Sequence, residues 1–288
     1  PTLAVVESYL AVGSEPRQLE ISADGSLLHI IYDGADLLTT VDLASLSVSR
    51  TRQIDLVDTG TSLEPSQALK IAVSPLAADT VVMLLDELAG SFFGGLTVFQ
   101  DGVPLVDDVP TTDLQGSPSN RDIQVVFDVS GSPYALIDDV DTATVQSLTI
   151  GPSGLSAGAF FQLPGVPVGW WGRADVQGNE VFTPLGSVID LVNQTGDARF
   201  DTGAPSFDDG RGGIGITADV PANDAFVLVG SGNGSGIGRY ALDTGAFIGE
   251  QELPAFGPSR LIDVEGDKLG IVAQPSTGLI VIDKAAVQ

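Results

Sequence analysis

Apolar and polar residues alternate along the chain in short runs rather than with a long helical period. Apolar or alternating runs of about 4 to 8 residues recur between clusters of Gly, Pro, Asp and Ser. Such runs are typical of β-strands bounded by turns, because a helix would place apolar residues three or four positions apart over a longer stretch. The pattern predicts an almost all-β chain.

The strand pattern also repeats. The clearest unit runs from Pro16 to Val48 and predicts a strand, an Asp-Gly turn, a strand, a short loop, a third strand, an Asp-led turn and a fourth strand. Further units of the same order begin near Pro65, Ser119, Gly172, Gly210 and Pro258. Their mean spacing of about 48 residues is typical of the four-stranded blades of a propeller, whereas a sandwich has no such period.

The repeat therefore predicts a β-propeller of six four-stranded blades, in a single domain over residues 1–288. The last unit supplies three strands, and the segment Leu3–Val12 would supply the fourth. That exchange would close the ring and cover an exposed strand edge. Seven blades are the alternative, if residues 87–113 or 151–169 hold a degenerate unit.

The first unit carries a family resemblance. Its Ala23–Leu28 run, a following strand and then Val41–Leu43 resemble the YVTN-type β-propeller repeats of bacterial and archaeal surface proteins. The resemblance covers this unit best and most of the chain in part, and the YVTN tetrapeptide itself is missing. It implies a propeller fold, while function does not follow from fold alone.

Composition narrows the classes of partner. The 288 residues include 12 Lys+Arg and 38 Asp+Glu, which gives a net charge of −26. So acidic a chain is a poor binder of nucleic acid or of anionic membranes, and no apolar run approaches the roughly 20 residues that cross a bilayer. The absence of Cys excludes disulfides and thiolate chemistry. The acidity predicts an extracellular, cell-surface or periplasmic protein, from which any export signal has been removed.

Basic residues recur at one place in the units. The opening of the first predicted strand holds Arg17, Arg121, Arg173, Arg211 and Arg260, with Gln67 at the matching place in the second unit. If first strands line a central channel, these guanidinium groups would gather at its mouth and bind a carboxylate or phosphate. The alternative is that each arginine ties adjacent blades together. Arg17, Leu19 and Ile21 share parity, which predicts that they continue a packing face.

Trp171 lies two positions before Arg173. Its ring would either stack on a ligand beside the arginines or pack between blades.

The same strands contain carboxylates. Glu20, Asp175 and Asp263 could converge on the channel and bind calcium, which takes oxygen ligands in flexible geometry. This layout is similar to that of gluconolactonase-type six-bladed propellers, which hold a catalytic metal in the channel. Lys70 would lie beside such a metal and repel it. A water-filled polar lining, to which Gln124 would also belong, is the alternative.

Nucleophilic catalysis has little support. His29 is the only histidine, and it lies within the strand run Leu27–Tyr32, so we expect it to fill a place in the sheet. The leading hypothesis is a secreted or cell-surface propeller that acts as a binding or assembly module, for a small anionic ligand or a protein partner, without doing chemistry. The alternative is a calcium-dependent hydrolase or lactonase with its site in the channel.

Two smaller sequence features concern turns. Asp residues end four predicted third strands and are expected to shape the next turn through Asx hydrogen bonds, at Asp42, Asp190, Asp243 and Asp283. The glycine-rich segment Gly230–Gly236 lacks the spacing of a phosphate-binding loop and is expected to form a loop between two strands.

Overall fold

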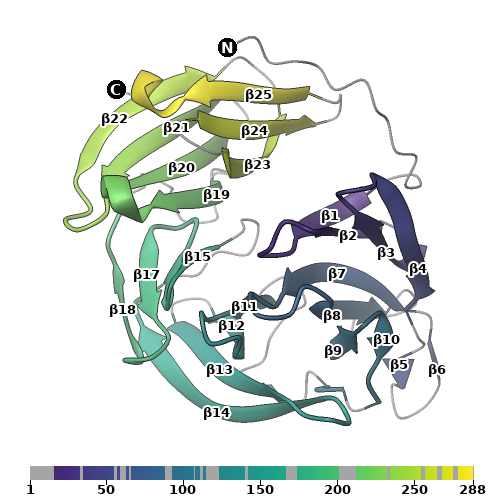
Figure 1. The fold of residues 1–288 in the computed structure, drawn as a ribbon. Coiled ribbons are helices and arrows are strands. Elements are labelled where there is room, and N and C mark those ends of the chain that lie inside the picture. Colours follow the sequence, from purple (N-terminus) through teal and green to yellow (C-terminus); the bar gives the residue numbers. More distant parts are fainter. Residues whose placement is uncertain are drawn as a thin grey trace. The chain divides into compact units, whose positions relative to one another are not determined.

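The computed structural model describes residues 16–32, 35–54, 57–58, 63–64, 66–87, 93–106, 108–110, 113–114, 123–139, 142–166, 174–200, 212–231, 234–253, 257–264, 268–274 and 278–287. Over these ranges the chain forms β-strands and short 3-10 helices, and no α-helix (Figure 1). None of the helices in these ranges has the length and apolar character needed to cross a membrane.

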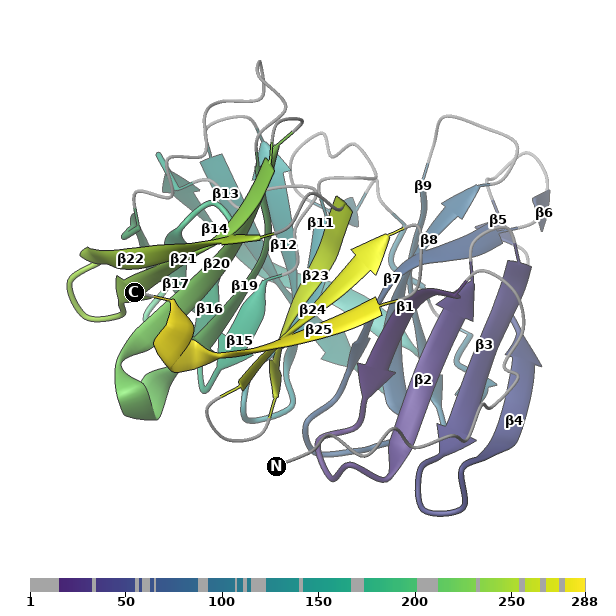
Figure 2. The same cartoon turned by 90° about the horizontal axis from the view of Figure 1, so that it is seen from above.

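The described strands pair in chain order. They form five four-stranded sheets, one three-stranded sheet and one two-stranded sheet. The first sheet comprises β1 (Pro16–Ile21), β2 (Leu27–Tyr32), β3 (Ala35–Asp42) and β4 (Ser47–Gln53), side by side in Figure 2. The short pair β5 (Val57–Asp58) and β6 (Leu63–Glu64) follows it. The second sheet comprises β7 (Ser66–Val73), β8 (Thr80–Glu87), β9 (Phe93–Gln100) and β10 (Val103–Pro104).

The remaining sheets follow the same plan. The third comprises β11 (Ile123–Phe127), β12 (Pro133–Asp139), β13 (Thr142–Ile150) and β14 (Leu155–Pro164). The fourth comprises β15 (Asp175–Gln177), β16 (Glu180–Phe182), β17 (Ser187–Asp190) and β18 (Thr195–Ala198). The fifth comprises β19 (Gly212–Asp219), β20 (Asp224–Ser231), β21 (Gly234–Ala241) and β22 (Phe247–Leu253), with the 3-10 helix η4 (Val220–Ala222) after β19. The sixth comprises β23 (Gly257–Val264), β24 (Lys268–Gln274) and β25 (Gly278–Asp283), followed by η5 (Lys284–Ala286).

The strand order expected from the repeats is confirmed, because each predicted unit forms a sheet of its own. The two stretches that could have held a seventh unit supply β9, β10 and β14 in their described parts. Leu3–Val12 lies outside the described residues, so ring closure remains a prediction. The loop expected at Gly230–Gly236 is wrong for its described residues, since Gly230 pairs with Ser235 and Ser231 pairs with Gly234 in β20 and β21.

The first turn shows why the sequence Ala23–Leu28 reverses the chain. Asp24 Oδ1 accepts hydrogen bonds from Ser22 Oγ at 2.7 Å, from Ser26 N at 3.0 Å and from Ser26 Oγ at 2.7 Å. These bonds, the one from Ser22 above all, lower the pKa of Asp24 to about 2. Gly25 adopts a φ of 71°, a left-handed conformation that glycine accepts without steric cost.

The chain divides into two compact units. Unit 1 comprises Pro1–Asp113, Ser130–Pro133 and Thr149–Ala157, and unit 2 comprises Leu114–Val129, Tyr134–Leu148 and Gly158–Gln288. The single domain expected from the sequence stays a prediction.

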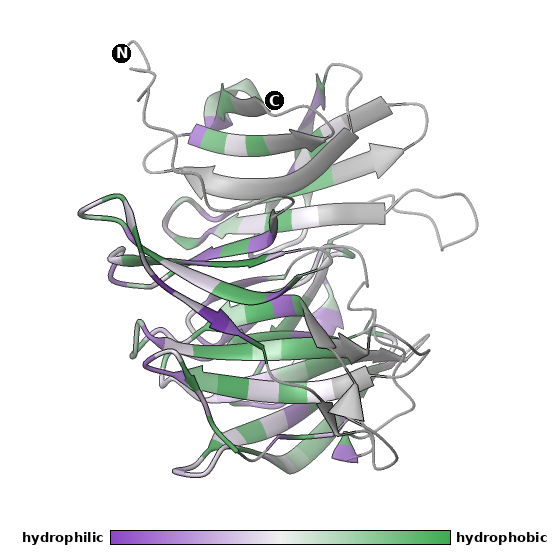
Figure 3. Cartoon of the chain, turned by 90° about the vertical axis from the view of Figure 1, so that its right-hand side faces the viewer, coloured by the Kyte–Doolittle hydropathy of each residue, from purple (hydrophilic) through white to green (hydrophobic). Residues whose placement is uncertain are grey.

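In each unit the apolar core lies between successive sheets. The core of unit 1 joins the first two sheets through residues that include Ile31, Leu38, Ile71 and Met83. Among the described residues of unit 2, such clusters join the third sheet to the fourth, the fourth to the fifth and the fifth to the sixth. Figure 3 shows the hydropathy of the described strands. Along β8 the consecutive residues Val81–Leu85 are all buried, so both faces of this strand are covered.

The C-terminal turn fastens the sixth sheet to the fifth. Lys284 Nζ lies 2.6 Å from Asp219 Oδ2 at the end of β19, and this contact lowers the pKa of Asp219. Val287 is fully buried in a cluster that includes Phe226 and Leu269. Residues at the end of the chain therefore belong to the core of unit 2.

Candidate functional site

The candidate site residues lie in, or directly before, the first strand of each sheet. Arg17 and Glu20 lie in β1, Gln67 in β7, Asp175 in β15, and Arg260 and Asp263 in β23. Outside the described residues are Arg121, Trp171, Arg173 and Arg211, and the side chains of Gln67, Arg260 and Asp263. The described candidate side chains are therefore those of Arg17, Glu20 and Asp175.

Four of these first strands carry a register shift near their start. The residues passed over by the pairing are Arg17 in β1, Leu69 in β7, Ile214 in β19 and Ser259 in β23. Arg17 is thus a bulge residue, whereas Arg260 comes one position after the bulge. The two arginines therefore differ by one position relative to the bulge of their strand. That the arginines share one repeat position stays a prediction.

Arg17 is exposed and links the first sheet to the second. Its Nε donates a hydrogen bond of 3.1 Å to the carbonyl oxygen of Leu69, the bulge residue of β7. A bulge leaves its extra residue unpaired in the ladder. The guanidinium group therefore satisfies a carbonyl of the neighbouring sheet, and its role in binding an anion stays a prediction.

The packing face of β1 differs from the expected one. Leu19 and Ile21 are 37% and 60% exposed, whereas Glu20 is only 7% exposed. The prediction that Arg17, Leu19 and Ile21 continue a packing face is therefore wrong. The reason is that the second sheet packs against the opposite face of β1, on which Gln18 and Glu20 lie.

Gln18 covers the free edge of the second sheet. Its Nε2 donates to the carbonyl oxygen of Ile71 at 2.9 Å, and its Oε1 accepts from Ile71 N at 3.0 Å. Nε2 also donates to Glu20 Oε1 at 2.7 Å, which orients the amide. Because β7 is the edge strand of its sheet, its outward N–H and C=O groups need partners. The Gln18 amide supplies a donor and an acceptor, as a neighbouring strand would.

Asp175 does the same for the fifth sheet. Its Oδ2 accepts hydrogen bonds from Ala218 N of β19 at 2.8 Å and from Gln177 Nε2 at 3.1 Å. Between the third and fourth sheets, the buried Gln124 accepts from Ala174 N at 3.0 Å. We call Gln18, Gln124 and Asp175 the edge-capping side chains, since each bonds to the backbone at or directly before the first strand of the next sheet.

The hydrogen bonds described above do not join any of the predicted calcium ligands to another. Glu20 belongs to unit 1, whereas Asp175 and Asp263 belong to unit 2. Over the described part of the chain, no group of three or more His, Asp or Glu residues is placed to hold a metal ion. A calcium site stays a prediction.

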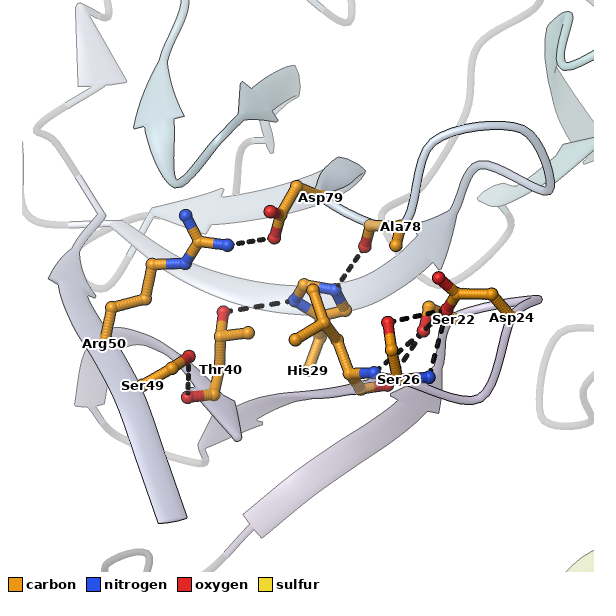
Figure 4. A network of polar contacts seen from close by, with 10 residues as sticks. Ser22, Asp24, Ser26, His29, Thr40, Ser49, Arg50, Ala78 and Asp79 are labelled. Atoms are coloured by element: carbon orange, nitrogen blue, oxygen red, sulfur yellow. Dashed lines mark hydrogen bonds and ion pairs between the residues drawn. The ribbon is translucent and has the colours of Figure 1, made fainter. Parts of the chain in front are cut away.

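His29 fills a place in the first sheet, as expected from the sequence (Figure 4). His29 is 1% exposed, with Nε2 at 2.8 Å from the carbonyl oxygen of Ala78 and Nδ1 at 3.2 Å from Thr40 Oγ1. Nε2 donates to the Ala78 carbonyl oxygen, and when the ring is neutral Nδ1 accepts from the Thr40 hydroxyl. Burial lowers the pKa of His29, against the opposing effects of the Ala78 hydrogen bond and the Asp79 charge. Asp79 itself forms an ion pair with Arg50.

Comparison with known proteins bears on the fold. No protein-family model and no curated protein sequence matches the chain. A functionally unknown protein from Desulfotomaculum acetoxidans DSM 771 has a TM-score of 0.64 at 13% identity, over 96% of this chain and 85% of that one. KlHsv2 with loop 6CD replaced by a Gly-Ser linker has a TM-score of 0.53 at 12% identity, over 93% of this chain and 77% of that one.

The dihydro-heme d1 dehydrogenase NirN, in complex with DHE, has a TM-score of 0.56 at 15% identity. The alignment covers 95% of this chain and 65% of NirN, so the chain spans less than two thirds of NirN. Identities this low show the fold alone. NirN and Hsv2 are β-propeller proteins, and this chain shares their type of fold.

Proposed function

We propose that the chain is a six-bladed β-propeller, closed by Leu3–Val12, that serves as a secreted or cell-surface binding or assembly module without catalytic activity. The observation that carries this proposal is the use of first-strand polar groups. The edge-capping side chains form hydrogen bonds to the backbone at or directly before the first strand of the next sheet; these side chains are Gln18, Gln124 and Asp175. Groups held in this way stabilise a scaffold, and they are not poised for acid–base chemistry.

The ligand of the module is a small anion held by first-strand arginines. Arg17 is exposed at the start of β1. On a chain with a net charge of −26, a group of arginines would be a local positive focus that selects carboxylates or phosphates. A propeller that presents such a focus can bind a free anion or an acidic segment of a partner.

Titration calorimetry with citrate and phosphate at fixed ionic strength tests the ligand. The variants are Arg121→Ala and Arg260→Ala, and the matched control is Arg52→Ala, which removes an exposed arginine from the outer strand β4. We expect binding to weaken about tenfold or more in the first two variants and to persist in the control. Unchanged binding with a lower melting temperature would show that the arginines serve only to tie sheets together.

A calcium-dependent hydrolase is the competing function. The same protein, melted with calcium and then with excess EDTA, separates the two. Our proposal expects the same melting temperature in both conditions, because no calcium is needed to hold the first strands. A calcium-dependent rise that EDTA reverses, and that Asp263→Asn abolishes, would contradict it.

A further inference from the structure

The outer edges of the described sheets are protected to different degrees. An unpaired edge strand invites pairing with another chain, and proteins counter this with short strands or with charged residues. β10 has two residues and β18 has four. β4 contains Arg50 and Arg52, and β22 contains Glu250 and Glu252. Each of these four edges therefore has a protective feature.

β14 lacks both features. It is ten residues long, Leu155–Pro164, and none of its residues is charged. It lies within a longer uncharged stretch, since residues 142–172 contain no Asp, Glu, Lys or Arg. In a chain with 38 acidic residues, so long a neutral stretch leaves this edge open to close approach by another molecule.

The inner side of β14 is held firmly by its own sheet. Leu155 and Leu163 are 2% and 8% exposed, and Ser147 Oγ of β13 donates to the carbonyl oxygen of Ala159 at 2.8 Å. Near the middle of the strand the side chains face solvent instead, and Phe160 is 47% exposed. β14 is thus held by its own sheet and has an exposed aromatic residue near its centre.

We propose that β14 pairs antiparallel with β14 of a second copy of this chain, which makes one continuous sheet across a two-fold axis. Charge selects the partner. Pairing β22 with itself would bring glutamates together, and pairing β4 with itself would bring arginines together, whereas β14 meets no charge in its own copy. Antiparallel pairing centred on Phe160 is self-complementary, because it places Phe160 of one copy directly opposite Phe160 of the other, with both rings on the same face of the sheet.

This pairing deepens the assembly role within the proposed function and rests on it. Sedimentation velocity of the whole chain at about 0.1 M and about 1 M NaCl tests it, because salt screens the repulsion between two acidic copies. We expect a dimer whose population rises with salt. Phe160→Lys, which places like charges across the pair, should give a monomer. Phe247→Lys is the matched control, since Phe247 is 58% exposed on the outer strand β22, and it should leave the dimer intact.

Cross-linking locates the contact independently. The chain has no cysteine, so Ala159→Cys and Phe160→Cys each introduce one thiol, and oxidised glutathione can accept the two electrons released when a disulfide forms. We expect covalent dimers from at least one of these variants and none from Phe247→Cys. Equal cross-linking of all three variants, or a dimer that survives Phe160→Lys, would overturn the proposed edge.

The two proposals fail in different ways. A wild-type chain that is monomeric at both salt concentrations, yet binds citrate through its arginines, would overturn the β14 pairing alone. A dimer abolished by Phe160→Lys in a protein that binds no anion would support the pairing and contradict the ligand.

Discussion

Gln18 with Glu20 and Gln177 with Asp175 form acid–amide pairs two residues apart on one strand. In β1 the amide reaches the next sheet and the acid orients it. In β15 the acid reaches the next sheet and the amide supports it. Both arrangements give the neighbouring backbone a partner, so the requirement at these positions is for a hydrogen-bonding side chain rather than for a particular charge.

The contribution of Gln18 can be measured by Gln18→Leu, which keeps the size of the side chain and removes its polar atoms. The N–H and C=O groups of Ile71 then lose their partners, which should lower the free energy of unfolding by about 1–3 kcal/mol. Urea denaturation measures the loss. Gln53→Leu on the exposed face of β4 is the control and should stay within about 0.5 kcal/mol. Equal effects of the two substitutions would refute an edge-capping role.

His29 should make stability depend on pH. Burial holds its pKa below the unfolded value of 6.5, so the folded chain binds fewer protons than the unfolded chain just below that pH. The contribution of the neutral His29 ring to the free energy of unfolding is therefore fully present above about pH 6.5, and it is lost as the pH drops towards the folded pKa. Asp79, Arg50 and Glu20 are the charged groups that act on the ring.

Urea denaturation at about pH 7.5 and about pH 5.5 measures this effect, and both values lie above the ordinary range of carboxylate titration. Because His29 is the only histidine, His29→Gln should remove most of the difference between the two conditions. A variant with the same pH dependence as the wild type would show that other groups cause it.

Gly245 lies in the turn between β21 and β22, where neighbouring backbone leaves no room for a Cβ atom. Its φ is 67°, and a Cβ there would overlap the carbonyl oxygen of Arg199. Gly178 has nearly the same φ of 69°, but no atom lies within 4 Å of its Cβ position. Gly178→Ala should cost about 1–2 kcal/mol for the backbone conformation alone. Gly245→Ala should cost about 3 kcal/mol, because the overlap adds to it. Thermal unfolding compares the two, and similar losses would contradict the close approach.

The four aspartates expected to shape turns show how far local sequence determines an element. Asp42 accepts from Ser45 N and Asp190 accepts from Asn193 N, as predicted, and these bonds lower the pKa of each carboxyl. Asp243 instead accepts from Asn223 Nδ2. For the fourth, Asp283, the partner is Lys268. Those two contacts join residues 20 and 15 positions apart in the chain, so a prediction from local turn patterns could not find them.

For the whole molecule, the repeat predicted the sheets because each unit pairs with itself. The position at which each sheet begins depends on the alternation of apolar and polar residues and on turn residues, both of which can be read from the sequence. The candidate site depended on the register of each first strand, and a bulge at Arg17 or Ser259 leaves no clear mark in composition. The tie from Gln18 to Ile71 joins residues 53 positions apart, so its recipient could not be inferred from spacing.

We propose that these sheets form one propeller closed by Leu3–Val12 on the outer edge of β25. Hydrogen exchange measured by mass spectrometry on the whole chain tests it most directly. If the segment is the fourth strand of the sixth sheet, its amide protons should exchange as slowly as those of β25. Exchange of Leu3–Val12 at the rate of an unprotected peptide, while β24 and β25 stay protected, would contradict the claim.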